Sequence, residues 1–391
     1  MKRAVALVSI LLTSVMVIAG CSGANKTMSS TPVNPASTTS ATTSSVNGGT
    51  NNVWAWGWNI VGLGDGTTTS SNIPVRVSGL SGVTAVSAGS GSGIALKNDG
   101  TVWTWGSNDS GMLGNGTTTD SNVPVKVSGL SGVISISASV DHNVALESDG
   151  TVWVWGLNNA SQLGNGTTAQ YSDVPIEVGG LTGVTAISAA EMYTLALKND
   201  GTVWTLGLDN KVPVQVGGLS GVTAVAAGTG FSLALENDGS VWAWGSNDFG
   251  QLGIGTTDDS NVPVQVSGLS GVTAISVRVS QSLALKNDGT VWAWGNNDSG
   301  QLGNGTTTNS NVPVQVSGLS GMSAISVGEE FSLALKKDGT VWAWGEDNYG
   351  QLGNGTTTGS DVPVQVGGLS GVTAISAGGQ FSLASTNVSA R

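Results

Sequence analysis

The chain has 391 residues, of which 60 are glycine and only 10% are charged, and its formal net charge is −12. This acidic balance opposes binding to DNA, RNA or anionic lipid surfaces, and we therefore expect no nucleic-acid partner. A single cysteine excludes an intramolecular disulfide framework, so the fold has to be stabilised by packing.

Residues 1–20 have the pattern of a secretory signal peptide. Lys2 and Arg3 form a basic start, and the apolar run over residues 4–19 is shorter than a typical membrane span. The run ends in Ile-Ala-Gly-Cys at Cys21, which resembles the lipobox of bacterial lipoproteins. That resemblance implies cleavage before Cys21 and lipidation of its thiol, with the lipid as membrane anchor. The alternative is an ordinary secretory peptide with an incidental cysteine.

Residues 21–51 contain mainly Ser, Thr, Asn, Gly and Pro, a composition typical of a flexible tether after the lipidated cysteine. We expect this tether to hold the domain formed by residues 52–391 away from the membrane. Ser22 stands where an aspartate would favour retention in the inner membrane. The sequence therefore predicts a lipid-anchored protein of the bacterial cell envelope, in the outer membrane if the bacterium is Gram-negative.

Residues 52–391 are built around a repeated β-hairpin, seen clearly between Ser232 and Gly245. Leu233 and Leu235 alternate with small or charged residues, which is the period of a strand. Asp238-Gly239 then supplies a tight turn before a second strand, Val-Trp-Ala-Trp-Gly. Each unit also carries a Pro-Val-Gln-Val strand and a Val-Thr-Ala-Ile-Ser strand, so about four short strands are expected per unit, as in a propeller blade.

The Val-Trp pair occurs seven times, mostly about 50 residues apart, but the preceding Asp-Gly turn occurs only six times. Val53-Trp54 has no partner strand before it, and Phe381–Ala384 has no Val-Trp after it. If these two ends pair, they complete a seventh unit and close a ring without exposed edges. We therefore predict an all-β, seven-bladed β-propeller closed by its N- and C-terminal strands, with an open solenoid as the alternative.

The run Trp-Gly-x-Asn-x-x-Gly-Gln-Leu-Gly-x-Gly, seen from Trp244 to Gly255, resembles the repeat of the regulator of chromosome condensation family. The resemblance covers about residues 52–391 and implies a seven-bladed propeller that binds other proteins through its faces and loops. Two departures stand out. Only His142 keeps the histidine of the family's strand motif, and the fourth repeat has Leu206 in place of its second Trp and lacks about twelve loop residues before Val212.

The repeats differ from one another mainly in two places: the three residues that end at the position of His142, and the residues that follow Trp-Gly. Six of the seven Tyr and Phe residues lie there, whereas the repeated Trp residues are interpreted as blade packing. Aromatic residues among small polar ones are typical of binding surfaces. We expect the partner-binding surface to contain Trp58, Asp141, His142, Glu191, Met192, Tyr193, Phe231, Phe249, Glu329, Glu330, Phe331 and Tyr349. For Phe231, Phe331 and Phe381 the alternative is that they fill space between blades.

Catalysis is poorly supported, because one histidine, one cysteine and scattered carboxylates form no nucleophile–base set. No metal-ligand cluster is recognisable, and we expect neither a metal nor a cofactor. The sequence favours a monomeric, non-enzymatic propeller that binds a protein at the cell envelope. A carbohydrate or cell-wall binding module is the first alternative, and an envelope hydrolase of unknown type is the second.

Overall fold

The computed structural model describes residues 41–42, 52–167, 169–208 and 210–387. The chain divides into two compact units, Met1–Asn34 and Pro35–Arg391, and all described residues belong to the second. The expected signal peptide, Cys21 and all of the expected tether except Ala41–Thr42 lie outside the described residues. Every described element is a β-strand.

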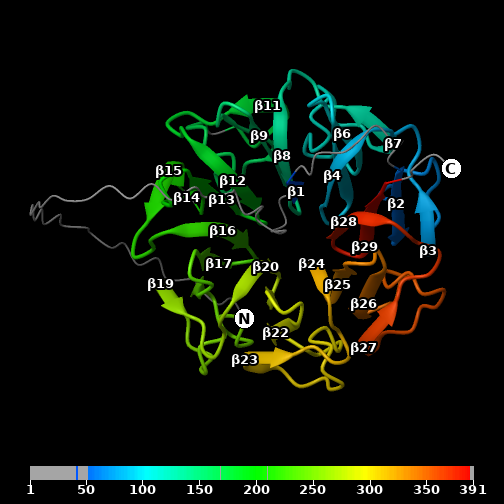
Figure 1. The fold of residues 1–391 in the computed structure, drawn as a ribbon. Coiled ribbons are helices and arrows are strands. Elements are labelled where there is room, and N and C mark those ends of the chain that lie inside the picture. Colours follow the sequence, from blue (N-terminus) through cyan, green and yellow to red (C-terminus); the bar gives the residue numbers. More distant parts are fainter. Residues whose placement is uncertain (1–40, 43–51, 168, 209, 388–391) are drawn as a thin grey trace, which may run out of the picture. The chain divides into compact units, whose positions relative to one another are not determined.

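Seven antiparallel sheets surround one axis, six with four strands and one with five, and we number them as blades 1 to 7 (Figure 1). In each blade the strands are given from the axis outwards. Blade 1 contains β28 (Val372–Ala377), β29 (Phe381–Thr386), β2 (Asn52–Gly57) and β3 (Ser71–Arg76), and blade 2 contains β4 (Val83–Ala88), β5 (Ser92–Lys97), β6 (Val102–Gly106) and β7 (Ser121–Lys126). Blade 3 contains β8 (Val133–Ala138), β9 (His142–Glu147), β10 (Val152–Leu157) and β11 (Tyr171–Glu177), and blade 4 contains β12 (Val184–Ala189), β13 (Tyr193–Lys198), β14 (Val203–Gly207) and β15 (Asn210–Val216).

Blade 5 contains β16 (Val222–Ala227), β17 (Phe231–Glu236), β18 (Val241–Gly245) and β19 (Ser260–Gln265). Blade 6 contains β20 (Val272–Arg278), β21 (Gln281–Lys286), β22 (Val291–Gly295) and β23 (Ser310–Gln315), and blade 7 contains β24 (Met322–Val327), β25 (Phe331–Lys336), β26 (Val341–Gly345) and β27 (Ser360–Gln365). A further two-residue strand, β1 (Ala41–Thr42), pairs with the inner edge of blade 3 at Ser135 and Ile136, within a segment that we expected to be tether only.

The ring closes inside blade 1, where the N-terminal β2 pairs with the C-terminal β29 from Asn52↔Thr386 to Gly57↔Phe381. This pairing joins Trp54 to Ala384 and gives blade 1 the same four strands as the other blades. The predicted propeller and its mode of closure are therefore confirmed, and the alternative of an open solenoid is wrong.

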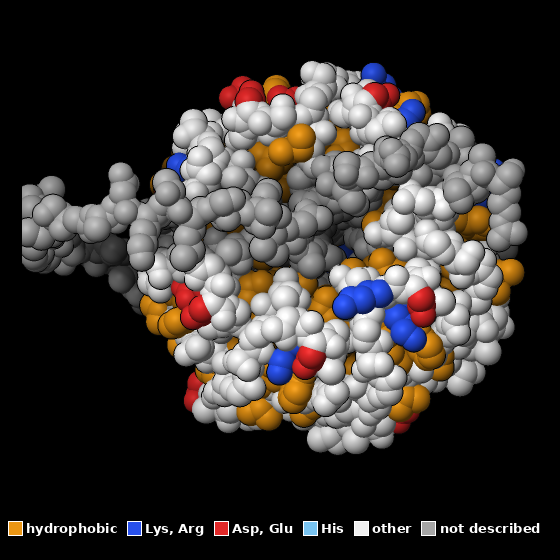
Figure 2. Space-filling model, in the orientation of Figure 1, with side chains coloured by type: hydrophobic (Ala, Val, Ile, Leu, Met, Phe, Trp, Pro, Cys, Tyr) orange, Lys and Arg blue, Asp and Glu red, His pale blue; other side chains and the backbone are white. Residues whose placement is uncertain are grey.

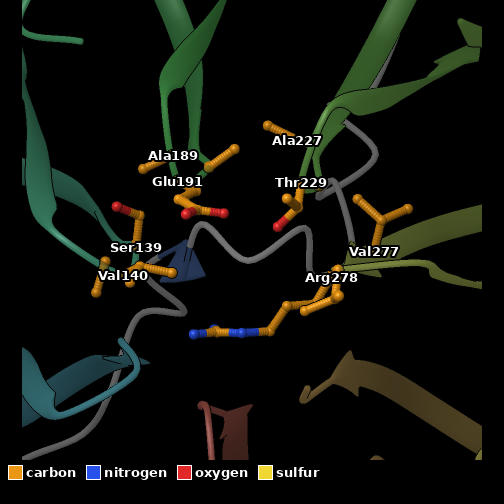
Figure 3. Close-up of a pocket in the computed structure, with 12 residues that line it drawn as sticks. Ser139, Val140, Ala189, Glu191, Ala227, Thr229, Val277 and Arg278 are labelled. Atoms are coloured by element: carbon orange, nitrogen blue, oxygen red, sulfur yellow. The ribbon is translucent and has the colours of Figure 1, made fainter. Parts of the chain in front are cut away.

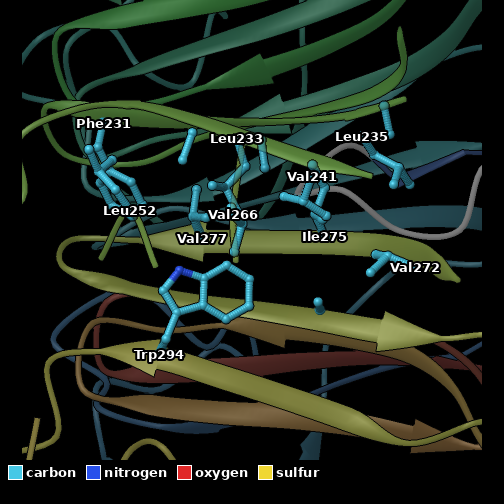
Figure 4. Close-up of a cluster of buried hydrophobic side chains, with 14 residues drawn as sticks. Phe231, Leu233, Leu235, Val241, Leu252, Val266, Val272, Ile275, Val277 and Trp294 are labelled. Atoms are coloured by element: carbon cyan, nitrogen blue, oxygen red, sulfur yellow. The ribbon is translucent and has the colours of Figure 1, made fainter. Parts of the chain in front are cut away.

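The hydrophobic core lies in the interfaces between neighbouring blades, which we call seams. In the seam between blades 5 and 6, Leu233, Leu235 and Val241 of blade 5 pack against Ile275 and Trp294 of blade 6 (Figure 4). Both faces of each middle strand are covered, because each blade has a neighbour on either side. Continuous burial along β17 and its equivalents follows from this arrangement.

Antiparallel pairing within the blades sorts the connections onto two faces of the ring. The loops between first and second strands, and those between third and fourth strands, leave the blades on one face, which we call the loop face. The Asp-Gly turns and the connections from one blade to the next lie on the other, the turn face. At one such turn, Gly239 has a φ of +83° and Asp238 Oδ1 accepts a hydrogen bond from Ser240 N at 2.8 Å, as expected for a tight turn.

Candidate binding surface

Both sets of variable residues lie on the loop face. The first set lies in the inner loops, such as residues 89–91 between β4 and β5, and the second lies in the outer loops, such as residues 107–120 between β6 and β7. Sequence reasoning defined the two sets separately and assigned them to no particular face. The topology therefore brings together nearly all of the variation among repeats.

The last residue of each inner set is not on the surface, which corrects part of our expectation. His142, Tyr193, Phe231 and Phe331 are each at most 3% exposed. Each begins the second strand of its blade, and its side chain enters the seam with the next blade. These four residues therefore support the loops and cannot form the contact surface themselves.

In three seams the side chain at this position is polar and forms hydrogen bonds with the second strand of the next blade. His142 Nε2 lies 2.8 Å from Thr194 Oγ1, and Gln281 Nε2 donates to Ser332 Oγ at 2.7 Å. The hydroxyl of Tyr193 donates to the carbonyl of Phe231 at 2.5 Å. Burial lowers the pKa of His142 to about 3, so its imidazole is neutral at pH 7. Polar partners thus bind these buried polar side chains, although Gln281 Oε1 has no partner among the described residues, and phenylalanine fills the same position in other seams.

The expected residues that do reach solvent are Met192, Phe249, Tyr349 and Glu330, with Trp58, Asp141, Glu191 and Glu329 half-buried. The exposed fractions of Met192, Phe249 and Tyr349 are 42%, 37% and 38%. The rings of Trp58 in blade 1 and Tyr349 in blade 7 have centroids 6.0 Å apart and an interplanar angle of 56°. The loop face therefore carries exposed apolar side chains on several blades.

Blade 7 and its neighbourhood gather carboxylates, two of which sequence reasoning missed. Burial, with the charges of Glu330 and Glu329, raises the pKa of Glu346. Burial raises the pKa of Asp347 to about 6, although Leu352 N donates to its Oδ1 at 2.8 Å. The other long loops have asparagine at the position of Asp347. This difference between the repeats could have identified Asp347 from the sequence.

The mouth of the central channel is crossed by Arg278, a third residue that sequence reasoning missed. The other six blades have a small residue at this position, directly before the three variable residues of the inner loop, and this contrast was the signal for Arg278 in the sequence. Its side chain extends across the axis (Figure 3) and donates to Ala88 O at 3.2 Å and Ser90 Oγ at 3.0 Å. Ser90 Oγ donates in turn to Glu329 Oε1 at 2.9 Å. A cavity of about 20 Å³ remains beside Arg278 and is also lined by Ser139 and Glu191.

The described residues contain no group of three or more His, Cys, Asp or Glu side chains placed to hold a metal ion. Within the same ranges, no helix has the length and apolar character that crossing a membrane requires.

Comparison with known families matches nearly the whole propeller. The family described as RCC1-like domain matches residues 208–384, and the Regulator of chromosome condensation (RCC1) repeat matches residues 50–96, 99–146 and 149–197. A second description of the same repeat matches residues 83–111 and 133–162.

Solved structures agree in fold. Prp20p from Saccharomyces cerevisiae is 21% identical, with a TM-score of 0.79 over 89% of this chain and 94% of that chain. Yeast RCC1 (Prp20) in its complex with Kap60 is 21% identical, with a TM-score of 0.80 over 95% of this chain and 97% of that chain. Human WBSCR16 is 22% identical, with a TM-score of 0.78 over 86% of this chain and 99% of that chain. Together, the matched repeats, the seven blades and the closure in blade 1 show that this protein belongs to the RCC1 repeat family.

Proposed function

We propose that this protein is a lipid-anchored, non-enzymatic propeller of the bacterial cell envelope that binds another protein through its loop face. One observation carries the proposal: the loops in which the repeats differ, the exposed Met192, Phe249 and Tyr349, and most of the acidic side chains share that face. Protein interfaces combine aromatic anchors with a polar rim, and this face provides both.

Charge favours a basic partner. Of the described residues, fifteen acidic ones lie on segments of the loop face, against two basic ones, Lys211 and the buried Arg278. Segments of the turn face hold nine acidic and seven basic residues, so the charges nearly balance there. In the view of Figure 2, blue and red side chains lie close together in several places. An acidic face speeds encounter with a basic surface, and salt weakens the attraction.

Related propellers support a protein partner. Prp20p is described with binding to Gsp1p and to histones, and yeast RCC1 (Prp20) is described bound to Kap60. For this chain we propose the same mode of action, a propeller surface that holds a protein, with a different partner at the envelope.

The anchor is proposed from the Ile-Ala-Gly-Cys motif that ends at Cys21. Cells fed labelled palmitate should incorporate it into the parent protein and not into the Cys21→Ser variant. The variant should also leave the membrane fraction. Label in the Cys21→Ser protein would contradict lipidation at this residue.

Affinity capture from envelope extract tests the binding function. The bait is the full chain in detergent, and the test variant replaces Glu191, Met192, Glu330 and Tyr349 with alanine. The control variant replaces Glu147, Glu177 and Glu236 on the turn face. We expect one protein to be retained by the parent and the control, lost with the test variant, and released as salt is raised. Equal retention by both variants would contradict the proposed face.

A carbohydrate ligand is the alternative outcome. Retention on insoluble peptidoglycan, reversed by soluble glycan, would replace a protein partner with a sugar. The 56° angle between Trp58 and Tyr349 speaks against this, because the two rings do not form one flat stacking platform.

A further inference from the structure

The outer loops hold neighbouring blades together at the rim of the ring. In six seams, a glycine N–H of the loop donates to a carbonyl on the outer strand of the next blade. These bonds are 2.8–3.0 Å long and join Gly66 to Asn122, Gly116 to Asp173, Gly166 to Lys211, Gly255 to Asn311, Gly305 to Asp361 and Gly355 to Asn72. Where the acceptor residue is asparagine, its Nδ2 donates back to the same glycine, as Asn311 does to Gly255 O at 2.9 Å.

The same loops also cover the second tryptophan of the next blade. In five seams, its indole N–H donates to a loop carbonyl, as Trp294 Nε1 does to Gln251 O at 2.8 Å. Each of these five indoles is 0% exposed: Trp56, Trp105, Trp155, Trp294 and Trp344. A glycine lies flat against each ring. At Gly253 and its four counterparts a Cβ would come within 2.6–2.8 Å of the indole, so only glycine fits.

The seam between blades 4 and 5 lacks this loop. β14 ends at Gly207 and β15 begins at Asn210, whereas the corresponding loop of blade 6 runs over residues 296–309. Trp244 of blade 5 is consequently half-exposed, and within the described part of the chain its Nε1 has no hydrogen-bond acceptor. Asn261, the equivalent of Asn311, is exposed, and the next residue, Val262, is 63% exposed against 40% for Val312. In Figure 1 this seam lies between the blades that end in β15 and β19.

We propose that this notch, formed by Trp244, Asn261 and Val262, binds an extended, glycine-containing loop of a partner protein, which takes the place of the missing loop. The six filled seams define the chemistry of the occupant. It supplies a backbone carbonyl to Trp244 Nε1, a glycine against the indole face, and a second glycine whose N–H and C=O pair with the backbone and side chain of Asn261. The notch lies at the rim and does not depend on the residues of the proposed loop-face contact.

The probe for the test is a synthetic peptide with the sequence of residues 299–308, Ser-Gly-Gln-Leu-Gly-Asn-Gly-Thr-Thr-Thr. The full chain in detergent is labelled with ¹⁵N, and the indole N–H signals are followed during titration. We expect a saturable shift of one indole signal, assigned to Trp244 by its loss in Trp244→Phe. Asn261→Ala should raise the Kd of the peptide about fivefold, the size expected for one lost hydrogen bond. A control peptide with valine in place of both glycines of Gly-Asn-Gly should not bind.

A second variant tests the site without relying on peptide affinity. Leu208 and Asp209 are replaced by a copy of residues 296–309, which restores a long loop in blade 4. We expect the inserted loop to protect the Trp244 indole from acrylamide as fully as Trp294 is protected, and to abolish the peptide-induced shift. Circular dichroism and a single cooperative unfolding transition confirm that the variant is folded.

Several results would overturn the proposal. They are an absent shift at millimolar peptide, equal binding of the valine peptide, and an inserted loop that leaves Trp244 accessible. A Trp244 indole already protected in the parent would show that another part of this chain or a second copy fills the notch. Dilution would separate these two, because only protection by a second copy is lost. A loop-face variant that fails in envelope capture but still binds the peptide would separate the two sites.

Discussion

The two seams that flank blade 5 each lack a different stabilising contact. Between blades 5 and 6 the rim is closed by Trp294 and Gln251, but near the axis Ala226 has no hydroxyl to offer to the next strand. Between blades 4 and 5 the axis is closed, because Ala227 N donates to Ser188 Oγ at 3.0 Å, but the rim is open at Trp244. A seam therefore persists when one of its contacts is missing. Only the loss at the rim exposes groups that can bind something else, since Ala226 stays 0% exposed.

The largest expected difference between the two seams is the effect of removing their tryptophans. Trp294→Ala should lower the free energy of unfolding by about 3–5 kcal/mol, the cost of deleting a fully buried aromatic side chain. Trp244→Ala should cost about 1–2 kcal/mol, because solvent already reaches that ring and less packing is lost. Urea unfolding of both variants measures this, and equal losses would contradict the open rim.

A smaller effect is expected from pH in the seam between blades 3 and 4. The folded pKa of His142, about 3, lies below the ordinary value of 6.5. The contribution of neutral His142 to the free energy of unfolding is therefore complete above pH 6.5, and it is lost as the pH falls towards 3. Between pH 7 and pH 4 this should remove about 3 kcal/mol of stability. His142→Gln, which copies the residue that Gln281 places at the same position in blade 6, should remove that part of the slope. Unfolding in urea at several pH values compares variant and parent, and identical slopes would contradict burial of a neutral imidazole.

A gain in stability is expected when Asp347, in the outer loop of blade 7, is replaced by the asparagine of the other long loops. Asn108 Nδ2 donates to the carbonyls of Thr117 and Thr119 at 2.9 and 3.0 Å, and ionised Asp347 cannot make the equivalent bonds in blade 7. Asp347→Asn should therefore add about 1 kcal/mol to the free energy of unfolding at pH 7. Burying the ionised carboxylate of Asp347 lowers the stability of the folded protein. This loss is absent below pH 3.8, the ordinary pKa, and complete above pH 6, near the folded pKa. The gain should accordingly grow as pH rises from 4 to 6, and a gain independent of pH would contradict this explanation.

The smallest effect concerns the axis of the seam between blades 5 and 6. Ser276 Oγ accepts a hydrogen bond from Val327 N at 3.1 Å, and five further serines accept equivalent bonds in their own seams. Ala226→Ser should complete this set and add about 0.5–1 kcal/mol, whereas Ser276→Ala should remove a similar amount. Thermal unfolding at pH 7 compares the two variants. A loss of stability in Ala226→Ser would show that this seam has no room for the hydroxyl.

The fold could be predicted from the sequence because its pattern is local and repeated. The Asp-Gly turns and the alternating Leu233 and Leu235 specified the blade, and the presence of seven Val-Trp pairs but only six Asp-Gly turns specified its closure. Among the variable aromatics, Phe249 and Tyr349 are exposed as expected, whereas Tyr193, Phe231 and Phe331 are buried in the seams, which was the alternative kept for the phenylalanines. Phe231 lies two residues before Leu233, so the strand period places both side chains on the same side of the blade. The residues at that position therefore lie within a seam and not on the surface.

The candidate surface could be predicted only in part, because it depends on residues that come together from different blades. Arg278 reaches Ala88 and Ser90 in blade 2 from the opposite side of the channel, and no spacing in the sequence encodes that contact. Exposure of Trp244 likewise follows from a deletion in the preceding blade. Predicting either feature from the sequence requires the order of the repeats around the ring and the direction in which each loop reaches its neighbour.

Closure of the ring in blade 1 also sets a time constraint on the synthesis of the protein. β2 can find its partner β29 only after some 330 further residues have been made, the separation between Trp54 and Ala384. At roughly 5–20 residues per second, the first Val-Trp strand waits on the order of tens of seconds for the strand that completes its blade. During that interval blade 1 consists of two outer strands without the inner pair. The emergence of β29 thus decides when blade 1, and with it the ring, can become native.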